Sequence, residues 1–384
     1  MFFKDILGHE KEKSFLRQIV QEKRVPHAQI FLSHEGHGSL ALTSAYASYL
    51  LCEERNELES CGICSNCVKS HKLIHPDLHF AFPVSKKEGL NREETTSNAF
   101  INEFRSAFIA NPFMTESEWA KAMEASSALN INVRECQEIA GKLSLQAFGN
   151  GPKIMVIWLP EYLGKEGNRL LKLIEEPTDN THIFLVSENQ SMIMPTILSR
   201  CQLVRISAFS DEDISNYIEN NYGIINNLDQ IVRLSEGNLA KAIKIAQGND
   251  TDYSDLIINW LRIAFKNDAV AMSDFVNQIS TQSKDTLQDF LSYSLHFIRE
   301  HQYFMATGKV PRLNDTEIKV SKNIAQFLDF SKIDSFYNIL ENTIFGINRN
   351  ANIKVLFMAQ TILIGDILKN NMNNYVNTIN FAIQ

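Results

Sequence analysis

The sequence has no apolar stretch long enough to cross a membrane. The most apolar late segment, Thr361–Leu368, is short and contains Asp366, whereas a spanning helix needs about 20 predominantly apolar residues. Near the N-terminus, Lys4 and Asp5 lie inside what would have to be the apolar core of a signal peptide, which argues against secretion. We therefore expect a soluble cytoplasmic protein without a membrane partner.

Basic charge is also scarce. The chain has 37 Lys and Arg against 45 Asp and Glu, a net charge of −8 at pH 7. A protein that coats nucleic acid by itself needs a basic surface, so this balance argues against that class. It leaves open a local basic patch or membership of a DNA-binding assembly. With 384 residues, 44% apolar and 21% charged, the chain is typical of a folded protein of two or three domains.

A third absence concerns the segment Phe31–Leu40. An apolar run, Ala28–Leu32, leads into a turn that contains Gly36 and Gly38, and a helical pattern follows over residues 41–52. Strand, glycine-rich turn and helix form the frame of a phosphate-binding P-loop, G-x-x-x-x-G-K-[ST], whose backbone amides hold phosphate oxygens at a helix N-terminus.

The residues that give a P-loop its chemistry are missing from this frame. With Gly38 as the second glycine, Ser33 stands in place of the first, Ser39 replaces the lysine, and Leu40 replaces the Ser or Thr that holds magnesium. We therefore interpret Gly36 and Gly38 as the turn of a degenerate P-loop, and we expect this chain neither to bind ATP tightly nor to hydrolyse it.

A second nucleotide-binding element lacks its acids. Lys153–Trp158 is a short continuous apolar run, typical of a buried parallel strand. In P-loop ATPases such a strand ends in an acidic residue that coordinates magnesium. Here Trp158 and Leu159 hold those places, and Glu161 lies two residues too far along to replace them.

Four of the six cysteines are clustered in a pattern typical of metal ligands: Cys52, Cys61, Cys64 and Cys67. Two thiolates separated by two residues can face one tetrahedral zinc ion, and four thiolates close the site, so this zinc would be structural. The alternative is a set of free, partly buried cysteines. With four thiolates available, nearby histidines are not needed as ligands (His71, His75 and His79).

The order of the remaining elements predicts an α/β domain followed by helices. Short apolar strands alternate with helices up to about residue 207, a pattern typical of a parallel sheet. The strands are expected at 28–32, 153–158, 182–187 and 202–206, and the helices include 133–147 and 168–176. Beyond Ser207 the periodicity is helical, with two predicted buried faces (Leu287, Phe290, Leu291, Ser294, Phe297 and Ile298; Leu356, Ala359, Gln360 and Leu363).

One polar segment, residues 85–127, has no assigned chemistry. Its main apolar residues lie near helical spacing, which predicts a helical excursion with one packed face (Phe100, Phe104, Phe108 and Phe113).

Taken in chain order, these motifs resemble those of the bacterial clamp-loader ATPases of the AAA+ class, over nearly all of residues 1–250 and more loosely beyond. The motifs are Ile6-Leu7-Gly8-His9, Val25-Pro26-His27-Ala28, the P-loop frame, the four cysteines, Leu170–Pro177 (LLKLIEEP) and Pro195–Cys201 (PTILSRC). Active members carry the P-loop lysine, the acidic pair, and an arginine near the place of Ala240. The resemblance is therefore to the subunit type that does not hydrolyse ATP. Segment 85–127 is longer than the family's usual connection.

The resemblance implies an α/β AAA+ P-loop core with a zinc module (1–207, the module at about 52–67), a small helical lid (208–250) and an all-α collar for oligomerisation (251–384). It implies a hetero-pentamer with gamma/tau ATPase subunits and a delta subunit, which loads a sliding clamp on primed DNA in the nucleoid-associated replisome. In the family, the arginine of Ser199-Arg200-Cys201 reaches across to a neighbour's nucleotide, and an arginine supplied in this way stabilises the transferring phosphoryl group.

Three alternatives stay open at this point. Arg200 can be a structural arginine that caps a helix or pairs with a carboxylate. The chain can be an active ATPase with an atypical P-loop, although the first basic residue after Gly38 is Arg55. It can also be a zinc-containing nucleic-acid-binding scaffold, although the cysteine segment is acidic rather than basic and aromatic.

Overall fold

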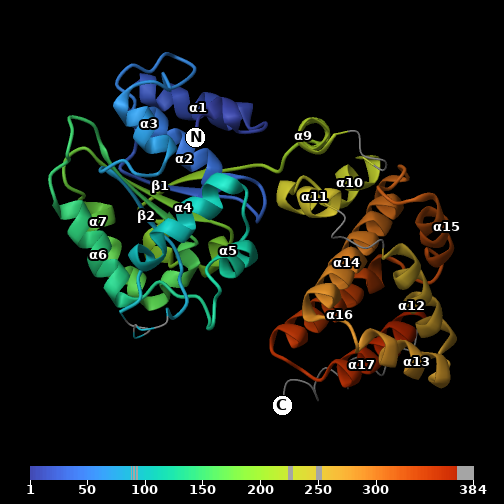
Figure 1. The fold of residues 1–384 in the computed structure, drawn as a ribbon. Helices are drawn as coiled ribbons and strands as arrows, with labels where there is room; N and C mark the ends of the chain where they lie inside the picture. The colour runs from blue at the N-terminus through green and yellow to red at the C-terminus, as the bar shows by residue number, and fades with distance from the viewer. Residues whose placement is uncertain (88, 90, 92–93, 224–227, 248–252, 370–384) are drawn as a thin grey trace. The chain divides into compact units, whose positions relative to one another are not determined.

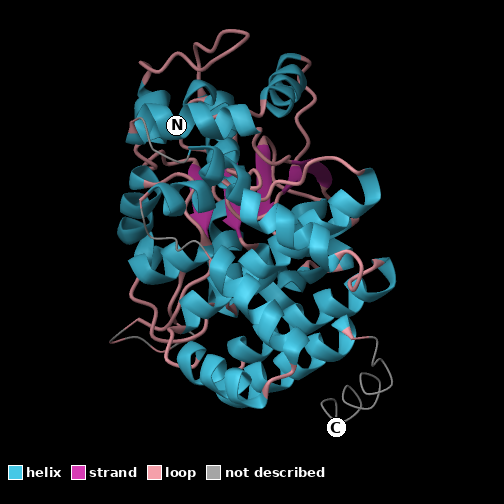
Figure 2. Ribbon diagram, turned by 90° about the vertical axis from the view of Figure 1, so that its right-hand side faces the viewer, coloured by secondary structure: helices cyan, strands magenta, loops and turns pink. Residues whose placement is uncertain are grey.

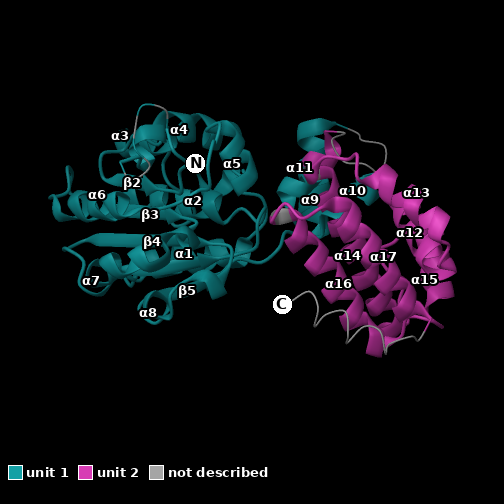
Figure 3. Ribbon diagram, turned by 90° about the horizontal axis from the view of Figure 1, so that it is seen from below, with its two compact units in different colours: residues 1–243 teal, residues 244–384 magenta. Residues whose placement is uncertain are grey.

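The computed structural model describes residues 1–87, 89, 91, 94–223, 228–247 and 253–369. The chain divides into two compact units, Met1–Ile243 and Lys244–Gln384 (Figure 3). The predicted boundary at 250/251 lies outside the described residues. No helix in the described part of the chain is long and apolar enough to span a bilayer.

The first unit is built on a five-stranded parallel sheet with the order β2-β3-β4-β1-β5. In Figure 2 its strands lie between layers of helices. The strands are β1 (Ala28–Leu32), β2 (Leu78–Ala81), β3 (Lys153–Trp158), β4 (Thr181–Ser187) and β5 (Gln202–Arg205). The predicted α/β class and four of these strands are confirmed. The edge strand β2 was not predicted, because four residues are too few to establish an alternation.

Helices cover both faces of this sheet, because successive side chains of a buried strand point to opposite sides. Helix α2 (Ser39–Leu51) is buried along its whole length and packs on β1, β3 and β4. On the other face, α6 (Val133–Ser144) contributes Ile139 and Leu143 to a core with Met155 and Ile157 of β3. The other helices around the sheet are α1 (Glu10–Gln21), α3 (Ser65–His71), α7 (Leu171–Glu175) and α8 (Pro195–Leu198).

Two predicted helices end or begin elsewhere. Helix α6 ends at Ser144, not at residue 147, and the predicted helix 168–176 is a 3-10 stretch (η3, Pro160–Leu170) that continues into α7.

The polar segment 85–127 forms two short helices, α4 (Ile101–Ala110) and α5 (Glu116–Ala122), beside the sheet (Figure 1). The four predicted phenylalanines are all buried, but only two of them belong to α4: Phe100 precedes the helix and Phe113 follows it. The prediction of one helical face was therefore partly wrong, because a single helix does not bury all four rings.

Three more helices complete the first unit after β5. They are α9 (Asp211–Tyr222), α10 (Leu228–Ser235) and α11 (Leu239–Ala246), the last of which runs across the boundary between the units. Helix α9 begins with a capping box, in which Ser210 accepts an N–H from Asp213 and the Asp213 carboxylate accepts the Ser210 N–H.

All regular elements in the described part of the second unit beyond α11 are helices: α12 (Ser254–Lys266), α13 (Ala269–Ile279), α14 (Lys284–Thr307), α15 (Asp315–Ile324), α16 (Phe330–Asn348) and α17 (Ile353–Leu368). The predicted buried face of α14 is confirmed at all six positions. The face predicted for α17 was mostly wrong: Gln360 is buried, but its neighbours in the core are Phe357, Thr361 and Ile364. Trp260 of α12 donates its indole N–H to Thr361 (2.8 Å), and this hydrogen bond places the Thr361 side of α17 against α12.

Candidate functional site

The turn between β1 and α2 has the backbone that a P-loop frame requires. Gly36 and Gly38 both have φ of 75°, a left-handed conformation that suits glycine, and Gly38 is the residue before the first turn of α2. A side chain on Gly36 would also collide with the amide of Asn238, whose oxygen lies 1.9 Å from the position of a Cβ atom.

The start of α11 is bonded to this turn. Asn238 Nδ2 donates to the carbonyl of Glu35 (2.9 Å), and the N–H of Leu239 donates to the carbonyl of Gly36 (3.0 Å). Two carbonyl groups of the turn are therefore hydrogen-bonded to the start of α11.

The positions of the missing lysine and Ser/Thr are closed off from solvent. Ser33 Oγ donates to Ser39 Oγ (2.8 Å), and Ser33, Ser39 and Leu40 are all buried. Two aromatic rings cover the start of α2: the nearest atoms of Phe113 and Phe209 lie 3.0 and 3.1 Å from the position of a Cβ atom on Gly38.

His37, between the two glycines, is a buried neutral imidazole. Burial, together with the neighbouring His34 and His9, lowers the pKa of His37 to about 4. His9 Nε2 contacts the carbonyl of His37 at 2.8 Å and holds this part of the turn against the N-terminal segment.

At the end of β3, Trp158 and Leu159 are each 2% exposed, and neither offers a group that could bind a metal ion. Glu161 has a different task. Its Oε1 accepts hydrogen bonds from Ser187 Oγ (2.7 Å) and from the N–H groups of Glu188 (2.6 Å) and Asn189 (2.7 Å). Glu161 therefore fixes the chain as it leaves β4.

The electrostatics beside this turn are unfavourable for a triphosphate. Burial, together with the carboxylates of Glu35, Glu161 and Glu116, raises the pKa of Glu188 to about 8. A raised carboxyl pKa reports a poorly solvated, negative surrounding, whereas nucleotide sites supply positive charge.

The four predicted metal ligands come together in the structure. The ligand atoms of Cys52, Cys61, Cys64 and Cys67 all lie within 4.8 Å of one another, and Cys61 Sγ is 3.9 Å from Cys67 Sγ. Four thiolates at the usual zinc–sulfur length of about 2.3 Å place their sulfurs about 3.8 Å apart in a tetrahedron. The cluster is therefore compatible with a structural zinc ion.

Backbone donors around the cluster suit thiolates. The N–H groups of Cys61, Cys64 and Cys67 donate to the sulfurs of Cys52 (3.2 Å), Cys61 (3.3 Å) and Cys64 (3.4 Å), respectively. Hydrogen bonds from the backbone of Cys64 and Ile63 lower the pKa of Cys61 to about 7.

The histidines near the cluster have other contacts. His71 Nδ1 contacts the amino group of Met1 (3.0 Å), and His75 Nδ1 accepts the N–H of Asp77 (3.1 Å).

Arg200 follows α8 at the surface, with its side chain 35% exposed. Its Nη1 donates to the carbonyl of Thr196 (2.9 Å) and to Ser199 Oγ (3.2 Å), and its Nε is paired with Glu175 of α7. Among the described residues, no partner is found for the two N–H groups of Nη2. The Nε and Nη1 groups of the guanidinium thus have partners within this chain, whereas the Nη2 N–H groups are free to donate to another molecule.

The two neighbours of Arg200 in the motif differ from each other. Ser199 is exposed and donates to the carbonyl of Thr196 (3.2 Å). Cys201 packs against the sheet core, and burial raises the pKa of its thiol to about 12, so it is a packing residue and not a nucleophile at neutral pH.

Two features of these sites were not predicted from sequence. Phe113 covers the turn although 75 residues separate it from Gly38 along the chain, and Glu175 pairs with Arg200 across 25 residues. The only sequence signal was weak: Glu175 belongs to the LLKLIEEP motif and Phe113 to the segment without an assigned role.

Comparison with known proteins agrees with the motif order. The model of the family described as "DNA polymerase III, delta subunit" matches residues 8–210, more than half of the chain. The delta-prime subunit of DNA polymerase III from Haemophilus influenzae is 23% identical over 201 residues, 52% of this chain and 48% of that protein. The Escherichia coli delta-prime subunit is 24% identical over 234 residues, 60% of this chain and 57% of that protein.

A tau/gamma subunit of H. influenzae is 21% identical over 301 residues, which cover 77% of this chain and 35% of that protein. The matches to the delta-prime subunits span about half the length of those relatives. Together with the family match over residues 8–210, they show that the chain belongs to the DNA polymerase III delta subunit family and is a delta-prime-like member of it.

Proposed function

We propose that this chain is the delta-prime subunit of a DNA polymerase III clamp loader, and that it lends Arg200 to the active site of a neighbouring ATPase subunit. Its own P-loop-like turn, with Gly36 and Gly38, neither binds ATP tightly nor hydrolyses it. The observation that carries the proposal is the surface position of Arg200, with free Nη2 donors, in a chain whose own turn has no lysine.

The loss of ATPase chemistry is supported by three independent features. Ser39 stands in place of the lysine, Trp158 and Leu159 stand in place of the acids, and the surroundings of Glu188 are negative. A working site needs the cation and the magnesium ligands together. Two histidines at the turn, His9 and His37, do not replace the missing cation, since the pKa of each is lowered.

The contribution of Arg200 would be electrostatic. Charge accumulates on the transferring γ-phosphoryl oxygens, and a guanidinium inserted from a neighbour neutralises it without taking part in bond making. The contacts to Thr196 and Ser199 would hold the guanidinium in place on α8. The Arg200 side chain would then already be ordered when this chain associates with the neighbouring ATPase subunit.

The rest of the proposed assembly follows the family. The partners would be gamma/tau ATPase subunits and a delta subunit in a hetero-pentamer, with the sliding clamp and primer-template DNA bound by the complex in the cytoplasmic replisome. The segment 208–250 would be the lid and 251–384 the collar through which the subunits associate. The four-cysteine cluster would hold a structural zinc ion.

The test is ATP hydrolysis by a reconstituted loader in which only the site facing Arg200 is active, the other ATPase sites being disabled by substitution of their P-loop lysines. With clamp and primed DNA present, we expect Arg200→Ala to slow hydrolysis at that site by about 10³-fold or more. The matched control is Arg24→Ala, which removes another exposed arginine paired with a carboxylate (Glu22, 3.4 Å) and should leave the rate unchanged.

The possible outcomes separate the parts of the proposal. Hydrolysis by the isolated wild-type chain would overturn the inactive turn and favour an ATPase with an atypical P-loop. A silent isolated chain with an unaffected Arg200→Ala complex would reduce Arg200 to a residue that caps α8 and pairs with Glu175.

A further inference from the structure

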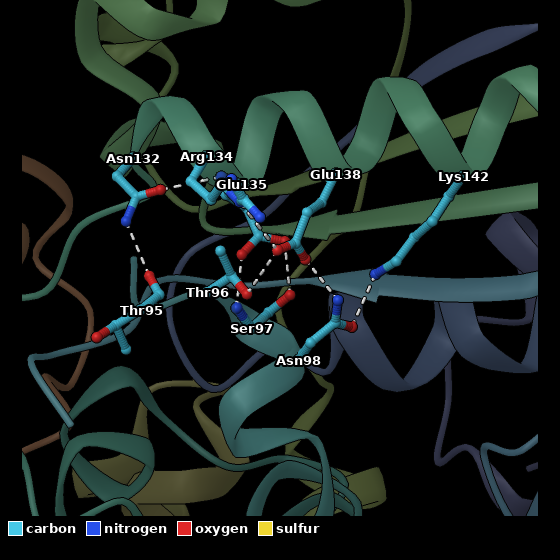
Figure 4. Close-up of polar contacts among 9 residues, drawn as sticks. All are labelled: Thr95, Thr96, Ser97, Asn98, Asn132, Arg134, Glu135, Glu138 and Lys142. Atoms are coloured by element: carbon cyan, nitrogen blue, oxygen red, sulfur yellow. Dashed lines mark hydrogen bonds and ion pairs between the residues drawn. The ribbon is translucent and has the colours of Figure 1, made fainter. Parts of the chain in front are cut away.

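The segment after residue 85 has no part in the function proposed above, yet the rest of the first unit holds it firmly. Figure 4 shows its first anchor, a set of polar contacts with α6. Ser97 donates its N–H and its hydroxyl to the two oxygens of Glu135 (2.5 and 2.6 Å), and Asn132 Nδ2 donates to the carbonyl of Thr95 (2.8 Å). Both Ser97 and Glu135 are almost completely buried.

The second anchor is an aromatic cluster that reaches the end of β3. Phe104 of α4 stacks on Phe82 with ring centroids 4.0 Å apart and lies 6.0 Å from the ring of Trp158. Trp119 of α5 packs edge-on against Phe104 (5.5 Å) and donates its indole N–H to the carbonyl of Pro83 (2.8 Å). The segment is thereby fixed against Trp158, the residue that stands where an ATPase has a metal-binding acid.

The loop between α4 and α5 then reaches the P-loop-like turn. Phe113 is 5% exposed and lies against Gly38 at the start of α2. The same ring packs edge-on against Phe209 (6.0 Å) and Tyr217 of α9 (5.9 Å). Phe113 therefore touches the turn and α9 at the same time.

Three residues later the segment adds a carboxylate. Glu116 accepts a hydrogen bond from the hydroxyl of Tyr162 (2.5 Å), and its charge contributes to the negative surroundings of Glu188. The segment thus brings an apolar ring to the helix N-terminus and negative charge beside it, the opposite of what a phosphate group requires.

We propose that residues 95–123 are a built-in plug: Phe113 closes the P-loop-like turn to nucleotide and ties the turn to α9. The inference rests on the proposed inactive turn but makes a separate claim. The turn is inactive because the lysine is missing, and it is closed because Phe113 covers it.

Hydrogen exchange on the full chain tests the link without nucleotide, DNA or partners. We expect Phe113→Ala to speed amide exchange about tenfold or more in peptides covering 33–45 and 211–222. The control is Phe148→Ala, since Phe148 is 81% exposed on the loop before β3 and its loss should change neither peptide. If Phe113→Ala does not fold, Phe113→Leu is measured in the same two peptides. Unchanged exchange in both peptides of the folded variant would overturn the plug.

Binding of a fluorescent ATP analogue with Mg²⁺ tests the closure. The variant Ser39→Lys/Leu40→Thr restores the missing P-loop residues, and we expect it to bind at least about tenfold more tightly when Phe113→Ala is added. Equal affinity of the two variants would overturn closure by Phe113. If the Ser39→Lys/Leu40→Thr variant does not fold, the hydrogen-exchange experiment on Phe113→Ala is the deciding test of the plug. Binding by the wild-type chain would contradict the inactive turn itself, and because the exchange experiment uses no nucleotide, the two failures can be told apart.

Discussion

Loss of the Glu135 carboxylate should destabilise the first unit more than loss of any other side chain in the network of Figure 4. Glu135 is 1% exposed and accepts two hydrogen bonds from Ser97, which is itself fully buried. A hydrogen bond to a charged group contributes about 1.5–3 kcal/mol, and a buried donor left without a partner costs about 1–3 kcal/mol.

Two opposing effects determine how much the loss of the Glu135 carboxylate lowers the free energy of unfolding. Removing the carboxylate leaves the Ser97 N–H without its acceptor and the Ser97 hydroxyl with only the long contact to the carbonyl of Phe80 (3.4 Å). Burial also raises the pKa of Glu135, so desolvation of the charge offsets part of the stabilisation that these hydrogen bonds give. We therefore expect Glu135→Gln, which keeps the volume but presents an NH₂ group to a donor, to lower the free energy of unfolding by about 2–3 kcal/mol.

The matched control is Glu138→Gln, one turn further along α6. Glu138 accepts hydrogen bonds from Thr96 and Asn98, but its side chain is 25% exposed, so water can replace these partners, and its ion pair with Arg134 is long (3.8 Å). We expect a cost of about 0.5 kcal/mol for this substitution.

Tryptophan fluorescence during urea unfolding measures both variants. Of the three tryptophans, Trp119 and Trp158 lie in the first unit and Trp260 in the second. All measurements are made in a Trp260→Phe background, so that the signal reports the first unit and the background effect cancels. Equal unfolding midpoints for Glu135→Gln and Glu138→Gln would refute the reasoning that buried donors dominate this network.

Two further predictions concern acid and metal. The pKa of His37 is lowered from 6.5 to about 4, so between these values the unfolded chain takes up a proton that the folded chain does not. Stability is therefore full above about pH 6.5 and falls toward pH 4, by up to about 3 kcal/mol from this group. Urea unfolding at pH 7 and pH 5 gives the free energy of unfolding that each protein loses between these two pH values. We expect this loss to be about 2 kcal/mol smaller for His37→Asn than for wild type. An equal loss would contradict the lowered pKa of His37. Metal analysis should find roughly one zinc per chain and almost none in Cys64→Ser, whereas a metal-free, fully folded wild-type chain would remove the zinc site.

The sequence alone determined the features whose signal is local. The strands at 28–32 and 153–158 were predictable because each is a continuous apolar run, and the buried face of α14 because its period is regular. The grouping of the four cysteines follows from their spacing, since ligands within sixteen residues meet without help from the rest of the fold. Likewise, the absence of a lysine after Gly38 can be read from the chain directly.

Only the tertiary structure decided what surrounds these features. Nothing local marks Phe113 as the neighbour of Gly38, Ser97 as the partner of Glu135, or Leu78–Ala81 as a strand beside β3, because each contact joins segments that are distant in the chain. Such pairings depend on the strand order and on which faces are left to be covered, and these are settled by the packing of the whole unit. The sequence thus predicts that the turn lacks the chemistry of a P-loop, while the fold shows that Phe113 covers the turn.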